Sequence, residues 1–169
     1  LTFVPNSYCN FGCKYCYLGK LTDNKTDYST VDKELKKIID IYDRSGILLH
    51  DISFHGAEVT TLPLPILDKL FKTCYDYQKE HAIMIKSLHG DYGCISIKTN
   101  LYRYDKVADI LNKYNVLVSC SIDLPFSHHR EFRVLKDGSD TFDKVYNNLI
   151  LLNKNTNGKF VMSCTIGIK

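Results

Sequence analysis

The chain has 169 residues, of which 44% are hydrophobic and 24% charged, a composition typical of one globular domain with a sizeable core. The formal net charge is only +3, and the basic residues are interspersed with acidic ones, so nucleic acid is not an expected partner. The sequence contains neither a run of about 18 apolar residues nor a signal-peptide pattern, so no membrane span is expected.

Strand-like and helical patterns alternate along the chain. Strand-like runs, rich in Val, Ile, Ser, Thr and Cys, cover residues 1–5, 51–55, 94–99, 116–122 and 160–168. Apolar residues recur at helical spacing in residues 31–42, 67–74, 107–114 and 142–152. This order predicts an α/β fold with a parallel sheet and right-handed crossovers. About five strands are too few to close an eight-stranded barrel, so an open partial barrel is expected.

Local signals set the expected ends of these elements. A cap in residues 29–32 opens the first helix, and Gly46 closes it. Pro63 and Pro65 open the second helix. Residues 82–93 exceed what a plain connection needs, and we interpret them as an insertion with a short extra strand.

A cluster of three cysteines follows the first strand. Cys9, Cys13 and Cys16 have the spacing C-x3-C-x2-C, and no further Cys occurs before Cys74 and no His before His50. A structural zinc site or a ferredoxin cluster would require a fourth ligand nearby. Three thiolates on a four-iron cluster leave one iron open to bind another molecule. A zinc or redox loop remains the alternative.

Backbone features of this loop suit a cluster. Asn10 and Gly12 tolerate left-handed backbone, and amides in such a loop can donate hydrogen bonds to cluster sulfurs. The other cysteines lie inside apolar patterns and are expected to behave as small hydrophobes: Cys74, Cys94, Cys120 and Cys164. This usage fits a reducing cytoplasm rather than a secreted disulfide scaffold.

Polar residues follow three further strands. His55-Gly-Ala-Glu58 follows the second strand, Thr99-Asn100 the third and Ser121-Ile-Asp123 the fourth. Ligands of parallel α/β sheets bind at the carboxyl ends of the strands. These residues and the cysteine loop are therefore expected to meet on one rim.

With these motifs the chain resembles the radical SAM superfamily, whose hallmark is this cysteine spacing with an aromatic residue before the third cysteine, here Tyr15. The resemblance implies a 4Fe–4S cluster on the three cysteines and S-adenosylmethionine chelated by the open iron. One electron then cleaves the cofactor to a 5′-deoxyadenosyl radical. The resemblance also implies a partial barrel of six strand–helix units, of which about five strands are present here.

A longer signature is similar to one branch of that superfamily. Ser121-Ile-Asp-Leu-Pro125, His129, Arg133 and Phe142-Asp-Lys144 resemble the peptide- and protein-modifying enzymes, such as anaerobic sulfatase-maturating enzymes and ribosomal-peptide maturases. This implies a peptide or protein substrate, an external flavodoxin- or ferredoxin-like electron donor, and auxiliary iron–sulfur clusters in a region after the barrel. Residues 1–169 would then be one radical SAM core domain of a longer chain.

The resemblance also implies contacts to S-adenosylmethionine, while no catalytic residue is assigned. Several of these residues have a plainer alternative: loop packing for the two tyrosines and a surface ion pair for Arg133. His55 is equally well explained as a core histidine, Asp123 as a turn cap, and His128 and His129 as loop residues. The resemblance places Tyr15 and Tyr17 beside the adenine, and Gly56, Ala57 and Glu58 at the methionyl amine. It places Ser121 at the ribose or the methionine and Arg133 at the carboxylate. Asn100 is a further implied contact to the cofactor.

Four positions depart from the branch pattern. Ala57 and Leu101 stand where glycines are usual, Val59 where a proline is usual, and Leu124 where a glycine precedes Pro125. A branched residue would be strained at any of them that required positive φ. Two other functions stay open: a radical SAM enzyme acting on a small molecule, and a non-enzymatic iron–sulfur electron-transfer module. The lack of a basic stripe speaks against RNA as the substrate.

Overall fold

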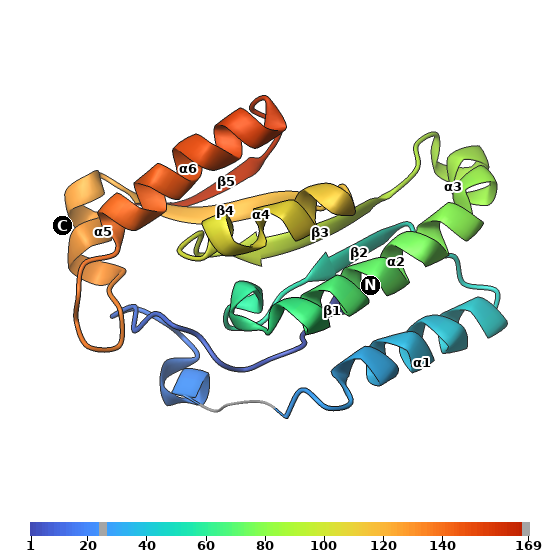
Figure 1. The fold of residues 1–169 in the computed structure, drawn as a ribbon, viewed down its shortest axis with the longest axis horizontal. Coiled ribbons are helices and arrows are strands. Elements are labelled where there is room, and N and C mark those ends of the chain that lie inside the picture. The colour runs from blue at the N-terminus through green and yellow to red at the C-terminus, as the bar shows by residue number, and fades with distance from the viewer. Residues whose placement is uncertain (24–26, 167–169) are drawn as a thin grey trace.

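The computed structural model describes residues 1–23 and 27–166. Its strands form one five-stranded sheet in chain order, and each strand pairs in parallel with the next. Because the sheet runs from β1 to β5 without closing, the predicted open partial barrel is confirmed (Figure 1). The strands are β1 (Thr2–Phe3), β2 (Asp51–Phe54), β3 (Cys94–Thr99), β4 (Leu117–Leu124) and β5 (Val161–Ile166). Residues 167 and 168 of the last predicted strand lie outside the described residues.

The four predicted helices lie side by side over one face of the sheet (Figure 1). They are α1 (Val31–Arg44), α2 (Leu64–Glu80), α4 (Tyr104–Lys113) and α6 (Phe142–Thr156). Two short helices, α3 (Ala82–His89) and α5 (Phe126–Phe132), lie at opposite ends of the sheet. Two 3-10 turns, η1 (Gly19–Asp23) and η2 (Val59–Thr61), complete the fold.

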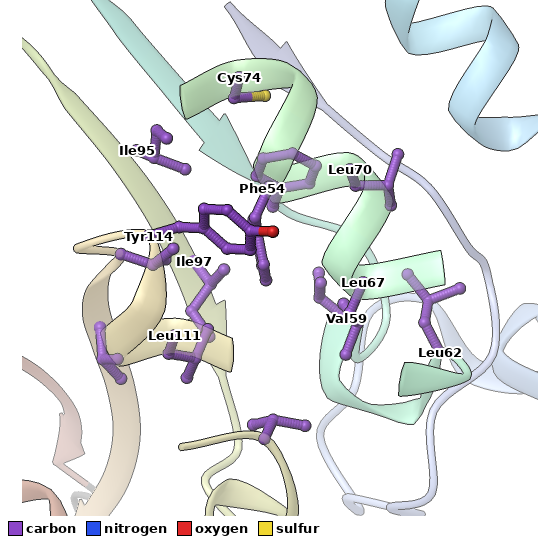
Figure 2. Packing of buried hydrophobic residues seen from close by; sticks show 14 of the residues in the cluster. Phe54, Val59, Leu62, Leu67, Leu70, Cys74, Ile95, Ile97, Leu111 and Tyr114 are labelled. Carbon is purple, nitrogen blue, oxygen red and sulfur yellow. The ribbon is translucent and has the colours of Figure 1, made fainter. Parts of the chain in front are cut away.

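The core lies between the sheet and the helices. Figure 2 shows Phe54 of β2 beside Leu67, Leu70 and Cys74 of α2, with Ile95 and Ile97 of β3 alongside. The ring of Phe54 meets that of Phe71 edge-on at 5.0 Å between centroids. Full burial of each such side chain contributes about 1.5–3 kcal/mol to folding, so this layer fixes the strand ends that carry the polar motifs.

The other face of the sheet is polar. Along β3 and β4, Ile95, Ile97, Val118, Cys120 and Ile122 are buried in the core. Side chains alternate along a strand, so the residues between them point away from the helices. The Ser96 hydroxyl donates to the Ser53 hydroxyl across the strands at 3.1 Å. The inner face of the open partial barrel, away from the helices, is therefore lined by Ser53, Ser96, Lys98, Ser119 and Ser121.

Several expected local features differ in the structure. Residues 82–89 form helix α3 rather than an extra strand. Ile85 of this helix is buried, whereas Ile83 and Leu88 are exposed. The cap of α1 is Thr30, and its side chain makes no capping hydrogen bond. Gly46 has the expected positive φ of 69° after α1, and Pro63 opens α2 as predicted.

The four remaining cysteines do not all behave as core residues. Cys74 and Cys120 are buried, as expected. Cys164 is exposed on the edge strand β5, so the prediction is wrong there. Cys94 is half-buried, and its thiol donates to Asp51 at 3.2 Å. Among the helices of the described residues, none has the length and apolar character that crossing a membrane requires.

Candidate functional site

The cysteine loop is held at the carboxyl end of the sheet by backbone hydrogen bonds. Gly12 N donates to Val134 O at 2.8 Å, and Lys14 N donates to Phe132 O at 2.9 Å. On its other side, Cys9 N donates to Thr22 O at 3.0 Å. The loop is thus fixed between η1 and the segment that follows α5, although these lie more than a hundred residues apart in the sequence.

A cavity of about 300 Å³ opens beside this loop. All residues assigned to the cluster or to S-adenosylmethionine from the sequence line it: Cys9, Cys13, Tyr15, Cys16, Tyr17, Gly56, Ala57, Glu58, Asn100, Ser121 and Arg133. His55 lines it as well. The expected convergence of the strand-end motifs on one rim is therefore observed.

Two of the thiols, those of Cys9 and Cys13, lie in an environment that disfavours the thiolate when no metal is bound. Burial raises the pKa of the Cys9 thiol to about 12, and the nearby Glu58 charge adds to this effect. Burial also raises the pKa of Cys13, while the Arg133 guanidinium opposes the increase. Metal ligation requires deprotonated thiols, so iron binding here would release protons.

Cys9, Cys13 and Cys16, which all belong to the described residues, do not form a site for a single metal ion. Within residues 1–23 and 27–166, no group of three or more His, Cys, Asp or Glu side chains converges on a single metal-ion position. A cubane cluster does not need such convergence, since each thiolate binds its own iron. The Phe11 amide donates to the Cys9 sulfur at 3.3 Å, as expected for an amide that tunes a cluster.

Glu58 joins the ends of β2 and β3. Its carboxylate is 1% exposed and accepts four hydrogen bonds. Oε1 accepts from Thr60 N at 3.1 Å, from Thr60 Oγ1 at 2.6 Å and from Thr99 Oγ1 at 2.7 Å. Oε2 accepts from Asn100 N at 2.6 Å. Because Oε2 has one donor in this set, it retains capacity to accept from a ligand in the cavity.

The cysteine loop also contacts the end of β3 through asparagines. Asn100 Nδ2 donates to Asn10 Oδ1 at 2.9 Å and lies 3.8 Å from the Cys9 sulfur. A further asparagine, Asn6, donates through Nδ2 to Glu58 O at 3.0 Å. Gly56 packs so closely here that an added Cβ would lie 2.7 Å from Asn6 O, and its φ is 131°. Residue 56 is therefore a glycine for steric reasons.

Tyr15 does not present a free phenol to the cavity. Its hydroxyl donates to Asp123 Oδ2 at 2.5 Å and accepts from Arg133 Nη1 at 3.0 Å. Burial and the bond to Asp123 raise the pKa of Tyr15 to about 12, so the phenol stays protonated. Tyr17 differs, since 93% of it is exposed.

His129 and His128 lie in helix α5, so their assignment to a loop is wrong. His129 is fully buried, its Nδ1 accepts from Asp123 N at 3.4 Å, and burial lowers its pKa to about 4. His128 Nδ1 lies 3.6 Å from Asp123 Oδ2. Asp123 thus contacts both histidines from the end of β4, which the expectation of a simple turn cap did not include.

One of the four departures from the branch pattern falls at a left-handed residue. Leu101 has φ of 68°, whereas Ala57, Val59 and Leu124 do not have positive φ. Asn148 Nδ2 donates to Leu101 O at 2.8 Å, and the Leu101 side chain is fully buried. Burial and this hydrogen bond offset the strain of a branched residue in the αL region, which is of order 1–2 kcal/mol.

Some cavity residues were not singled out from the sequence. Lys98 lines the cavity from β3, and Phe11 and Leu18 line it from the cysteine loop. The alternation of polar and apolar residues in β3 is the signal that could have placed Lys98 on the inner face. No sequence signal links Tyr15 to Asp123.

Comparison with known proteins places this geometry in a family. A model of the radical SAM superfamily matches residues 3–169. A serine-type anaerobic sulfatase-maturating enzyme of Bacteroides thetaiotaomicron is 31% identical over 150 residues, which cover 86% of this chain and 34% of that protein. The radical SAM cyclopropyl synthase TigE of Paramaledivibacter caminithermalis is 28% identical over 171 residues, which cover 93% of this chain and 33% of that protein. The chain thus spans about a third of the length of these relatives.

Solved structures agree on the fold. Native anSMEcpe with bound AdoMet superposes with a TM-score of 0.69 at 22% identity, covering 96% of this chain and 42% of that one. The same protein with bound AdoMet and the Cp18Cys peptide gives a TM-score of 0.68 at 23% identity, covering 96% and 41%. At this identity the likeness concerns the fold alone.

Proposed function

This chain belongs to the radical SAM superfamily, whose model matches residues 3–169, and from that premise we propose that it holds a 4Fe–4S cluster on Cys9, Cys13 and Cys16 and cleaves S-adenosylmethionine reductively. The observation that carries the proposal is the single cavity that all three cysteines and the strand-end motifs line. The cofactors supply the chemistry, which is one-electron cleavage to a 5′-deoxyadenosyl radical that removes hydrogen from a substrate.

The residues of the cavity fit these groups. Three thiols without a fourth protein ligand in the motif suit a cluster with one open iron. A cavity of about 300 Å³ is at the lower end of the range for small-molecule sites. Arg133 is 8% exposed, lines the cavity, and has a buried Nε without a hydrogen-bond partner in the part of the chain that the structure describes. An anionic ligand group would satisfy it.

The chain's own residues then bind and orient the cofactor. We assign the carboxylate of S-adenosylmethionine to Arg133 and its ammonium group to Glu58 Oε2, since a carboxylate accepts from an ammonium and a guanidinium donates to a carboxylate. Ser121 offers a hydroxyl from the inner face of β4. Tyr17, Gly56, Ala57 and Asn100 complete the wall of the cavity.

We further propose that the substrate is a peptide or protein. The support is the branch signature from Ser121 to Lys144 and the likeness to a protein named as a sulfatase-maturating enzyme. A flavodoxin- or ferredoxin-like donor would supply the electron in the cytoplasm, and auxiliary clusters would lie in a region beyond residue 169. A small-molecule substrate is the alternative.

Anaerobic reconstitution followed by iron and sulfide analysis tests the cluster. The wild type is expected to bind about four irons per core domain beyond any auxiliary clusters. Changing Cys9, Cys13 and Cys16 together to Ala should remove those irons. Cys74→Ala and Cys120→Ala are matched controls, since both residues are buried away from the cavity, and both should keep them. Equal iron in the triple variant and the wild type would contradict the assignment.

A further inference from the structure

The buried polar group at the end of β4 has a feature that the proposed function does not use. Tyr15, Asp123 and Arg133 come from the cysteine loop, from β4 and from the residue after α5. Asp123 is 1% exposed, and its Oδ2 accepts from the Tyr15 hydroxyl at 2.5 Å. The same hydroxyl accepts from Arg133 Nη1 at 3.0 Å. One phenol therefore joins a buried anion to a buried cation.

The Asp123 carboxylate and the Arg133 guanidinium are joined more closely through the Tyr15 hydroxyl than by direct contact. Arg133 Nη1 lies 3.8 Å from Asp123 Oδ1, which is too long for a hydrogen bond. Asp123 Oδ1 has no hydrogen-bond partner among residues 1–23 and 27–166. The Tyr15 hydroxyl thus orients the guanidinium of Arg133 at Nη1. The Arg133 side chain lines the cavity, and its buried Nε has no hydrogen-bond partner among the described residues.

This arrangement also bears on how Tyr15 can act. Its hydroxyl is committed to Asp123 and Arg133, and its ring lies near those of His128 and Phe132, at 6.5 and 6.4 Å between centroids. The ring is therefore packed on the α5 side of the cysteine loop. A residue that only stacked on an adenine would not need its hydroxyl at all.

We propose that Asp123 and Tyr15 are positioning residues that hold Arg133 in the orientation in which its Nε binds an anionic group of the cofactor, and that tie the cysteine loop to the end of β4. The inference rests on the proposed function. It assigns Tyr15 to orienting the carboxylate site, through its hydroxyl, rather than to stacking on the adenine.

The test uses the reconstituted full-length protein and the change that S-adenosylmethionine causes in the EPR signal of the reduced cluster. Tyr15→Phe keeps the ring and removes the hydroxyl. It is expected to leave the iron content near that of the wild type and to raise the S-adenosylmethionine concentration for a half-maximal EPR change by at least about 10-fold, the scale of one hydrogen bond to a charged group. Tyr146→Phe is the matched control, since Tyr146 on α6 is 41% exposed and Tyr15 is 42% exposed.

A double-mutant cycle separates orientation from simple packing. If Tyr15 and Asp123 act through one path, combining Tyr15→Phe with Asp123→Asn should weaken cofactor binding little more than the stronger single change does. Independent effects would multiply, and this result would contradict the shared path. Asp123→Asn keeps the size of the side chain, so its iron content checks that the variant is folded.

The outcomes distinguish the inference from the proposal beneath it. A wild type whose cluster signal does not respond to S-adenosylmethionine would overturn the proposed function, and the inference with it. A responding wild type with an equally responsive Tyr15→Phe variant would overturn the inference alone and would restore adenine stacking or loop packing as the role of Tyr15.

Discussion

Glu58→Gln is expected to weaken the fold by far more than its small change in size suggests. Glu58 Oε1 faces Thr60 N, and Oε2 faces Asn100 N. Gln has one carbonyl oxygen and one NH₂ group, so either orientation of its amide directs N–H at one of these backbone amides. The hydroxyls of Thr60 and Thr99 can rotate to suit the amide, but a backbone N–H cannot.

The cost follows from the bonds that are lost. One hydrogen bond to a charged group contributes about 1.5–3 kcal/mol, and a buried donor left without an acceptor costs about 1–3 kcal/mol. We expect the free energy of unfolding to fall by about 3 kcal/mol. With a urea m-value of about 2 kcal/mol/M, the unfolding midpoint followed by far-UV circular dichroism should fall by about 1.5 M.

Glu34→Gln provides the matched control for this experiment. The side chain of Glu34 is 52% exposed on α1 and forms an ion pair with Lys37 at 3.0 Å. An exposed ion pair of this kind contributes about 0–1 kcal/mol, so the urea midpoint of Glu34→Gln should stay within about 0.5 M of that of the wild type. If Glu58→Gln behaved like Glu34→Gln, the structural role assigned to the Glu58 carboxylate would be wrong.

Three further changes test other parts of the structure. His129 has a pKa of about 4 in the folded protein and of about 6.5 in the unfolded chain. Below pH 6.5 the unfolded chain therefore binds more protons than the folded protein, so the free energy of unfolding decreases as the pH falls. Between pH 7 and pH 5 this group lowers the free energy of unfolding by about 2 kcal/mol, and His129→Gln should remove that decrease. Urea midpoints at the two pH values measure it. A variant whose midpoint falls between the two pH values as much as that of the wild type would refute the effect of burial on His129. Leu101→Gly relieves the strain at φ 68° but removes a fully buried side chain, so it should destabilise by about 2 kcal/mol net; a more stable variant would show that strain outweighs packing. Gly56→Ala forces a Cβ against Asn6 O and should destabilise by about 1–3 kcal/mol, whereas a neutral result in the same denaturation assay would contradict the close approach at that position.

The architecture and most of the cavity residues could be predicted from the sequence, because the strand and helix signals and the strand-end motifs are local patterns. The alternation of strand and helix signals placed β3 correctly over Cys94–Thr99. The position of each polar motif after a strand brought Glu58, Asn100 and Ser121 to one cavity. Such patterns act within a few residues, so they can be recognised without knowledge of the tertiary contacts.

The missed features depend on contacts between distant residues. Tyr15 and Asp123 are 108 residues apart, and Glu58 and Asn100 are 42 apart, so no local pattern indicates either hydrogen bond. Helix α3 was misjudged because Ile83, Met84 and Leu88 are apolar yet exposed, and their spacing does not mark a buried face. The left-handed backbone at Leu101 is stabilised by burial and by Asn148, and it could not be predicted from propensity.

The central claim is that this cavity supports reductive cleavage of S-adenosylmethionine. The most direct measurement is chromatography for 5′-deoxyadenosine after the reconstituted full-length protein is incubated anaerobically with dithionite and S-adenosylmethionine. The wild type should form 5′-deoxyadenosine and methionine, and the variant with Cys9, Cys13 and Cys16 changed to Ala should form neither. A fully reconstituted wild type that forms no 5′-deoxyadenosine would contradict the account.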